Sequence, residues 1–301
     1  MDPLISVVVP AFNHQGLVEE ALASVLDQTW PEIELLVVDD ASTDDTADVV
    51  EEFLERPETQ ERLSGRRWLH RQPANAGAHA AINLGVSRAS GEWIAILNSD
   101  DRYLPDRLSR MMAELDASGG QLGFSGVRFI DEHGRESATG DGAAADLLNA
   151  QANLRSAPSI GFALLRRNAA VSTGNLLFRR SLHERVGGFR PLAYCHDWDF
   201  ALRSLLLTEP RFIPAPLYEY RLHGTNSFRA LGSVADQEAR EVLRGYFALV
   251  RAGQDENPLA PTPARWPAVF EAMMDAMGHW EHWKTAERAK VGPVLVPATE
   301  A

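Results

Sequence analysis

Four short apolar runs, rich in β-branched and aromatic residues, recur in the first hundred residues and predict buried strands. Three segments of helix length separate them. The first of these, "GLVEEALASVLDQ", repeats its apolar residues at the spacing of one helix face. The predicted strands are 4–10, 33–40, 66–72 and 92–98, and the predicted helices are 16–28, 44–55 and 76–89.

This alternation predicts an α/β fold, with a Rossmann-like, mostly parallel sheet flanked by helices on both faces. Ligands of such sheets bind beyond the carboxyl ends of the strands. In this chain those ends carry "PAFNH" (10–14), "DDAST" (39–43) and "NSDDR" (98–102). Three polar loops are therefore expected at one edge of the sheet.

The alternation weakens from about residue 121. Two further strands are predicted at 121–131 and 174–180, and the Gly- and Ala-rich segment 137–146 is expected to be a surface loop. A proline-rich break at 255–267 precedes a predicted helix over 266–290. Its apolar positions at helical spacing are Trp266, Phe270, Met273, Met277 and Trp280.

This C-terminal helix has three interpretations: packing on the domain, packing on a twin subunit, or lying on a membrane surface. Its histidines, His279 and His282, have no third ligand nearby in the sequence and are expected to face solvent. Residues 291–301 are expected to be frayed.

Composition narrows the class of protein. The chain has 301 residues, 45% of them hydrophobic, which is ample for a large core. Its formal charge of −13 argues against a nucleic-acid partner, because phosphate binding needs clustered Lys and Arg. The single cysteine, Cys195, excludes an intramolecular disulfide and fits a reducing compartment. With no signal-peptide pattern and no apolar run of membrane length, a cytoplasmic location is expected.

Adjacent acids at Asp100 and Asp101 raise the question of what balances their charge. Like charges side by side are either hydrated or neutralised by a cation. The first strand is followed by neither G-x-G-x-x-G nor a P-loop, so a bound phosphate would have no glycine cradle. A divalent metal held by carboxylates is the simplest substitute. Candidate acids are Asp39, Asp40, Asp100 and Asp101.

Local structural roles compete with metal and ligand binding for these acids. Asp39 and Asp40 could cap a loop, and the "STDD" that follows has the form of a capping box with Ser42 and Asp45. Asp100 could be the N-cap of a helix that starts near Pro105.

Four fragments, in order, resemble the motifs of inverting nucleotide-sugar glycosyltransferases of family 2, which have the GT-A fold. They are "ISVVVPAFNHQGLVEEALASVLDQTWPEIELLVVDDASTDDT", "NAGAHAAINLGVSRASGEWIAILNSDDRYLPDRL", "CHDWDFALR" and "YRLHGTN". The resemblance covers about residues 4–228. It implies a catalytic domain over 1–230, with a nucleotide-binding half (1–100) and an acceptor half (101–230), followed by a C-terminal helical extension (231–301).

The resemblance also implies roles for residues in the donor site. Asp40 would accept the imide N–H of a uracil or thymine ring. Asn98 stands where the family more often has the first Asp of D-x-D, and its amide would contact the ribose. The implied nucleotide-binding residues are Pro10, Ala11, Phe12, Asn13, Asp40, Asn75, Asn98 and Ser99.

The same resemblance places Asp100 on a divalent metal, Mn²⁺ or Mg²⁺, that bridges the two phosphates of the donor. His223 falls where relatives supply a histidine to the metal or the phosphate, and Arg221 would contact a phosphate. Asp101 is expected to orient the loop or a metal-bound water.

In "HDWDF", Asp197 matches the general base of the family, and His196 replaces a Glu. An inverting transfer needs such a carboxylate on the sugar face opposite the leaving diphosphate. Asp199, two residues further on, competes for this role. His14 and His79 are expected near the rim of the donor site, with no decided function.

The expected function is metal-dependent transfer of a sugar from a UDP- or dTDP-sugar to an acceptor hydroxyl. By resemblance, the acceptor is a glycan or a lipid-linked molecule, and the enzyme is either cytoplasmic or peripheral at the inner face of a membrane. Two rivals remain open. One is a metal-dependent phosphohydrolase or nucleotidyltransferase, and the other is a non-catalytic nucleotide-sugar binding module.

Overall fold

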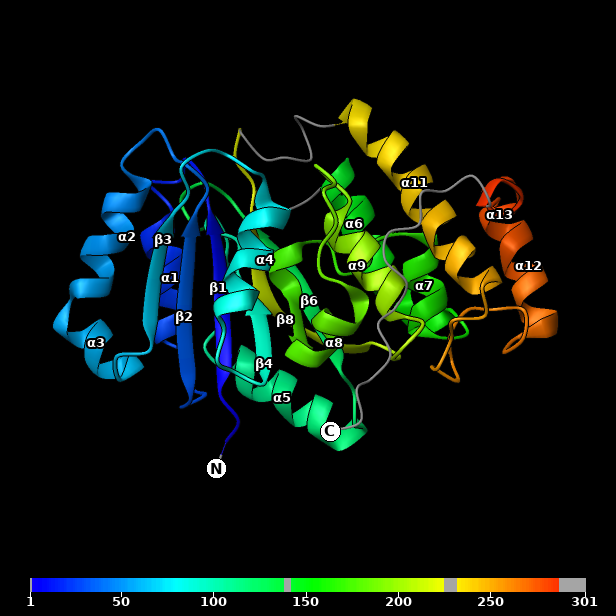
Figure 1. Ribbon diagram of the computed structural model, residues 1–301, viewed down its shortest axis with the longest axis horizontal. Helices are drawn as coiled ribbons and strands as arrows, with labels where there is room; N and C mark the ends of the chain where they lie inside the picture. Colours follow the sequence, from blue (N-terminus) through cyan, green and yellow to red (C-terminus); the bar gives the residue numbers. More distant parts are fainter. Residues whose placement is uncertain (1, 138–141, 225–231, 287–301) are drawn as a thin grey trace.

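A mixed β-sheet runs through the centre of the molecule (Figure 1). The computed structural model describes residues 2–137, 142–224 and 232–286. Within them the sheet has eight strands in the order β3-β2-β1-β4-β7-β6-β8-β5. The strands are β1 (Ile5–Ala11), β2 (Ile33–Asp39), β3 (Arg67–Arg71), β4 (Trp93–Ile96), β5 (Arg102–Tyr103), β6 (Leu122–Ile130), β7 (Leu176–Arg179) and β8 (Arg211–Arg221).

The first half of the sheet is parallel, as the sequence predicts. Strands β1, β2, β3 and β4 pair only in parallel with one another. β1 and β2 are almost entirely buried, because helices cover both faces, and this accounts for their continuous Val, Ile and Leu runs. Val7 and Val9 face the helices on one side, whereas Val8 contributes to the core on the other. The helices of this half are α1 (Val18–Leu26), α2 (Thr46–Glu55), α3 (Pro57–Leu63) and α4 (Ala78–Arg88).

The second half of the sheet mixes directions. β7 runs antiparallel to both β4 and β6, and β5 runs antiparallel to β8, while β6 and β8 are parallel. β8 was not predicted, because Pro214 and Pro216 lie inside it. The register between β6 and β8 shifts on both sides of Gly126, and these irregularities accommodate the prolines.

Helix α6 (Ala143–Ala152) begins inside a segment that was predicted to be a loop. The surface loop predicted over 137–146 is wrong at its end, because helix α6 begins at Ala143; residues 138–141 lie outside the described residues. The other elements of this half are α5 (Arg107–Ser118), α6 (Ala143–Ala152), η1 (Leu154–Ser156), α7 (Ile160–Arg166), η2 (Thr173–Asn175), α8 (Arg180–Val186) and α9 (His196–Ser204).

The C-terminal helices pack on the domain, at the right of Figure 1. They are α11 (Gly232–Arg251), α12 (Pro267–Met277) and α13 (Trp280–Thr285). The single helix predicted over 266–290 is wrong, because Gly278 adopts a left-handed conformation (φ +68°) that ends α12. Phe270 and Met274 are buried in the same core cluster as α7 and α9. The segment 291–301, predicted to be frayed, lies outside the described residues.

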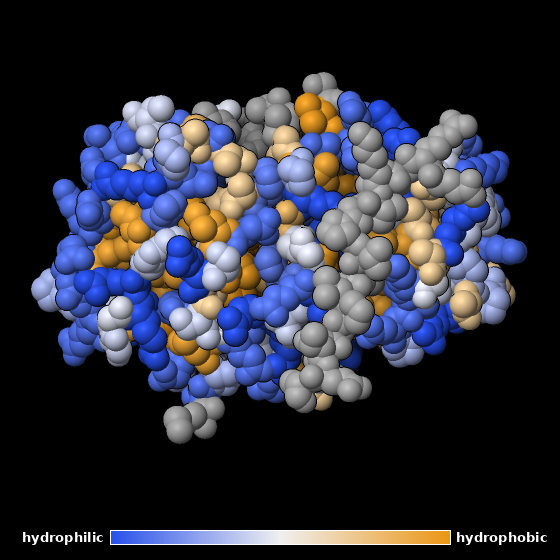
Figure 2. Space-filling view, in the orientation of Figure 1, coloured by the Kyte–Doolittle hydropathy of each residue, from blue (hydrophilic) through white to orange (hydrophobic). Residues whose placement is uncertain are grey.

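The face in Figure 2 is largely hydrophilic, with hydrophobic side chains gathered over the region of β3, β1 and α4. On β3 the ring of Trp68 stacks on His70, and the guanidinium of Arg88 lies 5.9 Å from the Trp68 ring centre. In the part of the chain that the structure describes, no helix combines the length and apolar character needed to cross a bilayer.

Candidate active site

The loops that follow β1, β2 and β4 meet at one edge of the sheet. Ala11 pairs with Asp39 at the ends of β1 and β2, so the two loops leave the sheet side by side. The Asp40 amide donates to the Ala11 carbonyl at 2.8 Å, and His14 Nδ1 lies 2.8 Å from Ser99 Oγ, which follows β4. The three polar loops predicted to share this edge therefore do so.

The loop after β1 is fixed to the loop after β2 through Asn13. Asn13 has a positive φ of 55°, its amide donates to Ser42 Oγ, and its Oδ1 accepts from the Thr43 amide at 2.8 Å. These bonds account for Ser42, so the predicted capping box is wrong and α2 starts without a side-chain cap. Beside Asn13, Phe12 is 41% exposed, an unusual state for a large apolar ring and one suited to stacking on a base.

Asp40 binds the loop between β3 and α4 through its carboxylate. Its carboxylate is buried and accepts from Gln72 Nε2 at 2.6 Å and from the Ala76 and Gly77 amides at 2.8 and 2.7 Å. Asn75 Nδ2 donates to the Asp40 carbonyl. Only one of these bonds reaches Oδ2, so an acceptor position remains for the predicted base contact. That contact stays a prediction.

Asp101 anchors the loop that carries Asp100. It is buried and accepts from the Tyr218 hydroxyl at 2.5 Å, from the Arg221 amide at 2.8 Å and from Asn98 Nδ2 at 3.0 Å. Burial and then the charge of Asp100 raise the pKa of Asp101. The orienting role predicted for Asp101 agrees with these contacts.

Asn98 uses its amide protons within the protein. Its Nδ2 donates to Asp101 and also to Ser172 Oγ at 2.9 Å. A ribose contact from Asn98 would therefore have to use Oδ1. An Asp at this position would lack both donors and would face the Asp101 carboxylate, which gives a physical reason for the amide here.

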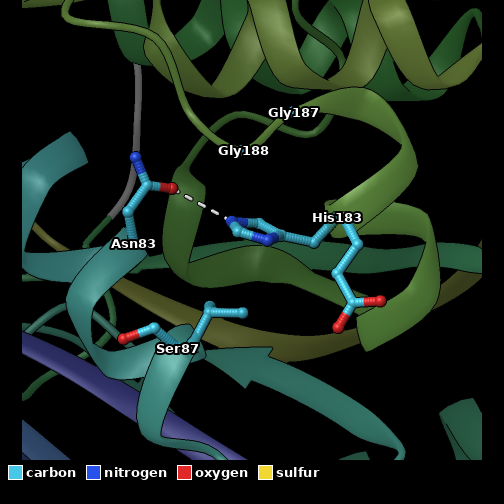
Figure 3. Close-up of a pocket in the computed structure, with 7 residues that line it drawn as sticks. Asn83, Ser87, His183, Gly187 and Gly188 are labelled. Carbon is cyan, nitrogen blue, oxygen red and sulfur yellow. Dashed lines mark hydrogen bonds between the residues drawn. The ribbon is translucent and has the colours of Figure 1, made fainter. Parts of the chain in front are cut away.

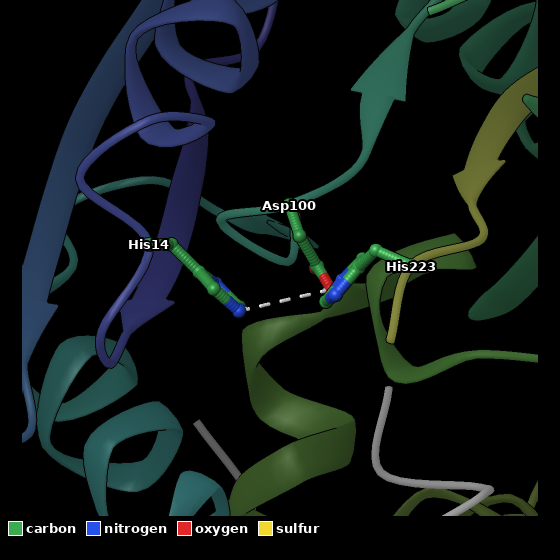
Figure 4. A group of neighbouring side chains, drawn as sticks. All are labelled: His14, Asp100 and His223. Carbon is green, nitrogen blue, oxygen red and sulfur yellow. Dashed lines mark hydrogen bonds and ion pairs between the residues drawn. The ribbon is translucent and has the colours of Figure 1, made fainter. Parts of the chain in front are cut away.

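Asp100 lies between two histidines from distant parts of the chain (Figure 4). His223 Nε2 donates to Asp100 Oδ2 at 2.9 Å, and His14 Nε2 lies 4.0 Å from the same oxygen. Burial raises the pKa of Asp100, but the hydrogen bond from His223 and the charges of both histidines outweigh it, so its pKa is lowered. One carboxylate oxygen and two imidazole nitrogens lie within 4.8 Å of one another, a donor set that fits a divalent metal.

Arg221 does not face this site. Its side chain is fully buried, with Nε donating to the Asp100 carbonyl and Nη2 to Glu20. Its Nη1 donates to the carbonyls of Asp131 and Glu132. The predicted phosphate contact of Arg221 is therefore wrong; the guanidinium supports the backbone of Asp100 instead.

Asp197 lies in the first turn of α9 and is buried. It accepts from Asn168 Nδ2 at 2.8 Å and from the Trp198 amide at 2.7 Å. Burial raises the pKa of Asp197, although the charge of His196 and the hydrogen bond from Asn168 oppose the rise. The rival Asp199 forms ion pairs with Arg203 at 2.6 Å and with Arg190 at 3.4 Å, so its charge is already matched.

Besides burial, the charges of Asp100 and Asp197 both raise the pKa of Tyr220, on β8. The pKa of Tyr220 is raised by burial first and then by the charges of Asp101, Asp100, Tyr194 and Asp197. The charges of Asp100, in the loop after β4, and of Asp197, on α9, therefore both reach Tyr220. His196 places Nε2 2.9 Å from Thr173 Oγ1, and its Nδ1 has no partner among the described residues.

Residues 6–187, well over half of the chain, match the sequence profile described as Glycosyl transferase family 2. The chain belongs to glycosyltransferase family 2. As a family 2 glycosyltransferase it is a transferase enzyme, and homologues named for polysaccharide biosynthesis agree with this.

Among curated relatives, the glycosyltransferase is 32% identical over 132 residues to the putative teichuronic acid biosynthesis glycosyltransferase TuaG of Bacillus subtilis, covering 44% of this chain and 50% of TuaG. It is 37% identical over 133 residues to the succinoglycan biosynthesis protein ExoO of Rhizobium meliloti, covering 44% of this chain and 36% of ExoO. The chain thus spans half or less of these two relatives.

Solved structures share the fold. TarS (1–349) of S. aureus superposes with a TM-score of 0.62 at 18% identity, covering 92% of this chain and 73% of that one. The mannosyltransferase PcManGT of Pyrobaculum calidifontis, in complex with GDP-Man and Mn²⁺, gives a TM-score of 0.62 at 20% identity, covering 96% and 74%. Both likenesses confirm the GT-A fold of the family 2 glycosyltransferase.

A separate pocket of about 470 Å³ lies between α4 and α8 (Figure 3). Asn83 Oδ1 accepts from the Phe189 amide at 2.9 Å and from His183 Nε2 at 3.0 Å. Burial and then the charge of Arg203 lower the pKa of His183 to about 4, so its ring is neutral at physiological pH. These bonds join α4 to α8 and the turn that follows it.

Three side chains near the site had no predicted role. His14 approaches Asp100, Asn168 binds Asp197, and Tyr218 binds Asp101. Each partner lies at least 29 residues away in the sequence, so no local pattern could have found the contact.

Proposed function

We propose that this glycosyltransferase moves a sugar, with inversion, from a nucleoside diphosphate sugar to an acceptor hydroxyl. The observation that carries the proposal is the grouping of Asp100 with His223 and His14, at the edge of the sheet where the loops after β1 and β4 meet. A UDP- or dTDP-sugar is favoured, because the remaining acceptor position of Asp40 suits the imide N–H of uracil or thymine. Exposed Phe12 is available to stack on the base.

Asp197 is the general base of the proposed reaction. It takes the proton of the acceptor hydroxyl while the acceptor oxygen attacks C1 of the donor sugar. The bond from C1 to the diphosphate breaks, and its electron pair leaves with the nucleoside diphosphate. Burial raises the pKa of Asp197, which strengthens it as a base, and Asn168 holds the carboxylate in position.

Asp100 and His223 are the residues that would hold a divalent ion, Mn²⁺ or Mg²⁺. The ion would supply Lewis-acid stabilisation of the charge on the leaving diphosphate. The chain's own contribution is to fix Asp100 in place, through Asp101 on one side and the Arg221 guanidinium on the other. No protein acid is then required at the leaving group.

The acceptor is proposed to be a growing glycan or a lipid-linked molecule, as the names of the relatives suggest. Action in the cytoplasm, at the inner face of a membrane, stays a prediction. The described part of the C-terminal helices packs on the domain itself. Contact of these helices with a membrane or a twin subunit stays a prediction.

Nucleotide binding tests this proposal. Thermal shift and calorimetry with UDP, dTDP, GDP and CDP, with and without Mn²⁺, are expected to show metal-dependent binding of UDP or dTDP. A ligand at 100 times its Kd stabilises the folded state by about 2.7 kcal/mol, which a melting curve detects readily. Melting that is independent of every nucleotide would contradict the proposal. Release of inorganic phosphate would favour a phosphohydrolase, and binding without any turnover would favour a non-catalytic module.

The pH profile should report on the contact between Asn168 and Asp197. Asn168→Ala removes a donor that stabilises the carboxylate, so the pKa of Asp197 should rise further. Because the base acts in its ionised form, kcat/KM increases with pH through this pKa. The acid limb is therefore expected to move up by roughly one pH unit, with the plateau largely kept.

The matched control for that profile is Asn149→Ala. Asn149 is an exposed asparagine on α6, and its replacement should leave the acid limb of the profile in place. An acid limb that does not move in Asn168→Ala would mean that Asp197 is not the group whose ionisation limits kcat/KM.

A further inference from the structure

The side chain of His14 is held in one orientation beside Asp100. Its Nδ1 lies 2.8 Å from the hydroxyl of Ser99, which is buried, and its Nε2 lies 4.0 Å from Asp100 Oδ2 (Figure 4). The His14 amide donates to Thr46 Oγ1 at 2.7 Å, and the left-handed Asn13 precedes it. Backbone and ring are therefore both fixed before any ligand binds.

Ser99 Oγ holds Nδ1 of the His14 ring in place, and its hydroxyl can either donate to this nitrogen or accept from it. When Nδ1–H donates to Ser99 Oγ, the lone pair of Nε2 is directed at the Asp100 carboxylate. A lone pair facing a carboxylate is unfavourable unless a cation lies between them.

His223 approaches Asp100 from the segment that follows β8. Its Nε2 meets Asp100 Oδ2 at 2.9 Å, and the rings of His14 and His223 stand 5.7 Å apart, nearly perpendicular to each other. All three candidate ligand atoms lie within 4.8 Å of one another. The group therefore has the composition and proximity of a three-ligand metal site rather than of an isolated ion pair.

We propose that His14 is a third protein ligand of the divalent ion, oriented by Ser99, and that the resulting two-nitrogen, one-oxygen set selects transition metals over Mg²⁺. Imidazole nitrogen suits later transition metals such as Co²⁺ and Zn²⁺, whereas Mg²⁺ prefers oxygen ligands. Ser99 is the positioning residue, since its hydroxyl, 2.8 Å from Nδ1, fixes the direction of the ring. This inference rests on the proposed function, because it concerns the ion of the same site.

Metal titration of the full chain tests the proposal without measuring turnover. Co²⁺ and Mg²⁺ are each titrated alone by calorimetry, and Co²⁺ binding is also followed by its visible absorption spectrum. In His14→Ala, Co²⁺ affinity is expected to fall more than about tenfold with an altered spectrum, and Mg²⁺ affinity much less. In Ser99→Ala, which leaves His14 present but unoriented, Co²⁺ affinity should fall roughly tenfold. His14→Asp, which offers an oxygen, should shift the preference towards Mg²⁺.

The matched control is His282→Ala. The rings of His282 and His279 lie 5.6 Å apart, a spacing close to the 5.7 Å between the rings of His14 and His223. The variant therefore removes one histidine from a similar pair that lies away from the proposed site. Co²⁺ binding at the proposed site should be unchanged in it. If His282→Ala reduced the binding as much as His14→Ala, the ion would sit elsewhere and the proposal would be wrong.

The remaining outcomes separate this proposal from the proposed function. If His14→Ala binds Co²⁺ with wild-type affinity and spectrum while Asp100→Ala does not, His14 is no ligand and the metal-dependent reaction stands. Equal losses of Co²⁺ and Mg²⁺ affinity in His14→Ala would assign His14 a structural role and overturn its part in selectivity. If the wild-type chain binds neither ion, alone or with UDP, both proposals fail.

Discussion

Asp197→Asn is expected to lower kcat by about 10²- to 10⁴-fold, the contribution usually made by a general base. The amide is nearly the same size as the carboxylate, but it cannot accept the proton of the acceptor hydroxyl. Donor affinity should remain close to that of the wild type, because the predicted donor contacts come from the other half of the sheet. Steady-state kinetics and calorimetry with the donor nucleotide, measured on the same preparation, separate the two effects.

Two results would contradict this role for Asp197. Unchanged turnover would mean that another group, or water alone, accepts the proton. A loss of donor affinity as large as the loss of kcat would mean that Asp197 binds the donor. Asp116→Asn, at an exposed acid on α5, is the control for a general effect of removing one negative charge.

Asp100→Ala should be similarly severe, but through donor binding. We expect kcat/KM to fall by about 10²- to 10³-fold, because Lewis-acid stabilisation supplies several kcal/mol. The gain in nucleotide affinity on adding Mn²⁺ should disappear, and a chelator should no longer affect the variant. His223 would also lose its carboxylate partner.

The control for Asp100→Ala is Asp106→Ala, in the same segment of the chain. Asp106 is half exposed and pairs with Arg110 at the surface at 3.3 Å, a contact worth little in water. The Asp106→Ala variant should retain metal-dependent binding of the nucleotide. If Asp100→Ala instead binds UDP in the presence of Mn²⁺ as tightly as the wild type, the ion is not held at this residue.

The parallel half of the fold could be read from the sequence because its signals are local. Each of its strands is a continuous apolar run, and the helices between them carry apolar residues at their own period. In the second half the signals conflict. β8 contains two prolines that are tolerated only because its pairing with β6 is irregular, and Gly278 breaks a helix whose apolar spacing continues past it.

Chain position alone leads to one residue of the proposed site. Asp100 follows a buried parallel strand, and this placement predicts a ligand-binding carboxylate. Asp197 is proposed as the base only through the resemblance, and the ion pairs that already match the charge of Asp199 favour Asp197 over it. Arg221 was misjudged because a sequence gives no burial, and a fully buried guanidinium must be matched by the protein's own acceptors.

The sequence also could not show that His14 lies beside Asp100. His14 lies 86 positions before Asp100 in the sequence and still further from His223, and only the folded sheet edge brings the three together. Its significance depends on the buried hydroxyl of Ser99, whose direction no motif specifies.

A crystal structure with UDP and Mn²⁺, using data collected at the manganese absorption edge, tests the central claim most directly. The account predicts one anomalous peak within coordination distance of Asp100 and His223, in contact with both phosphates, and Asp197 on the opposite side of the space for the sugar. A manganese peak remote from Asp100, or a diphosphate bound away from it, would contradict the account.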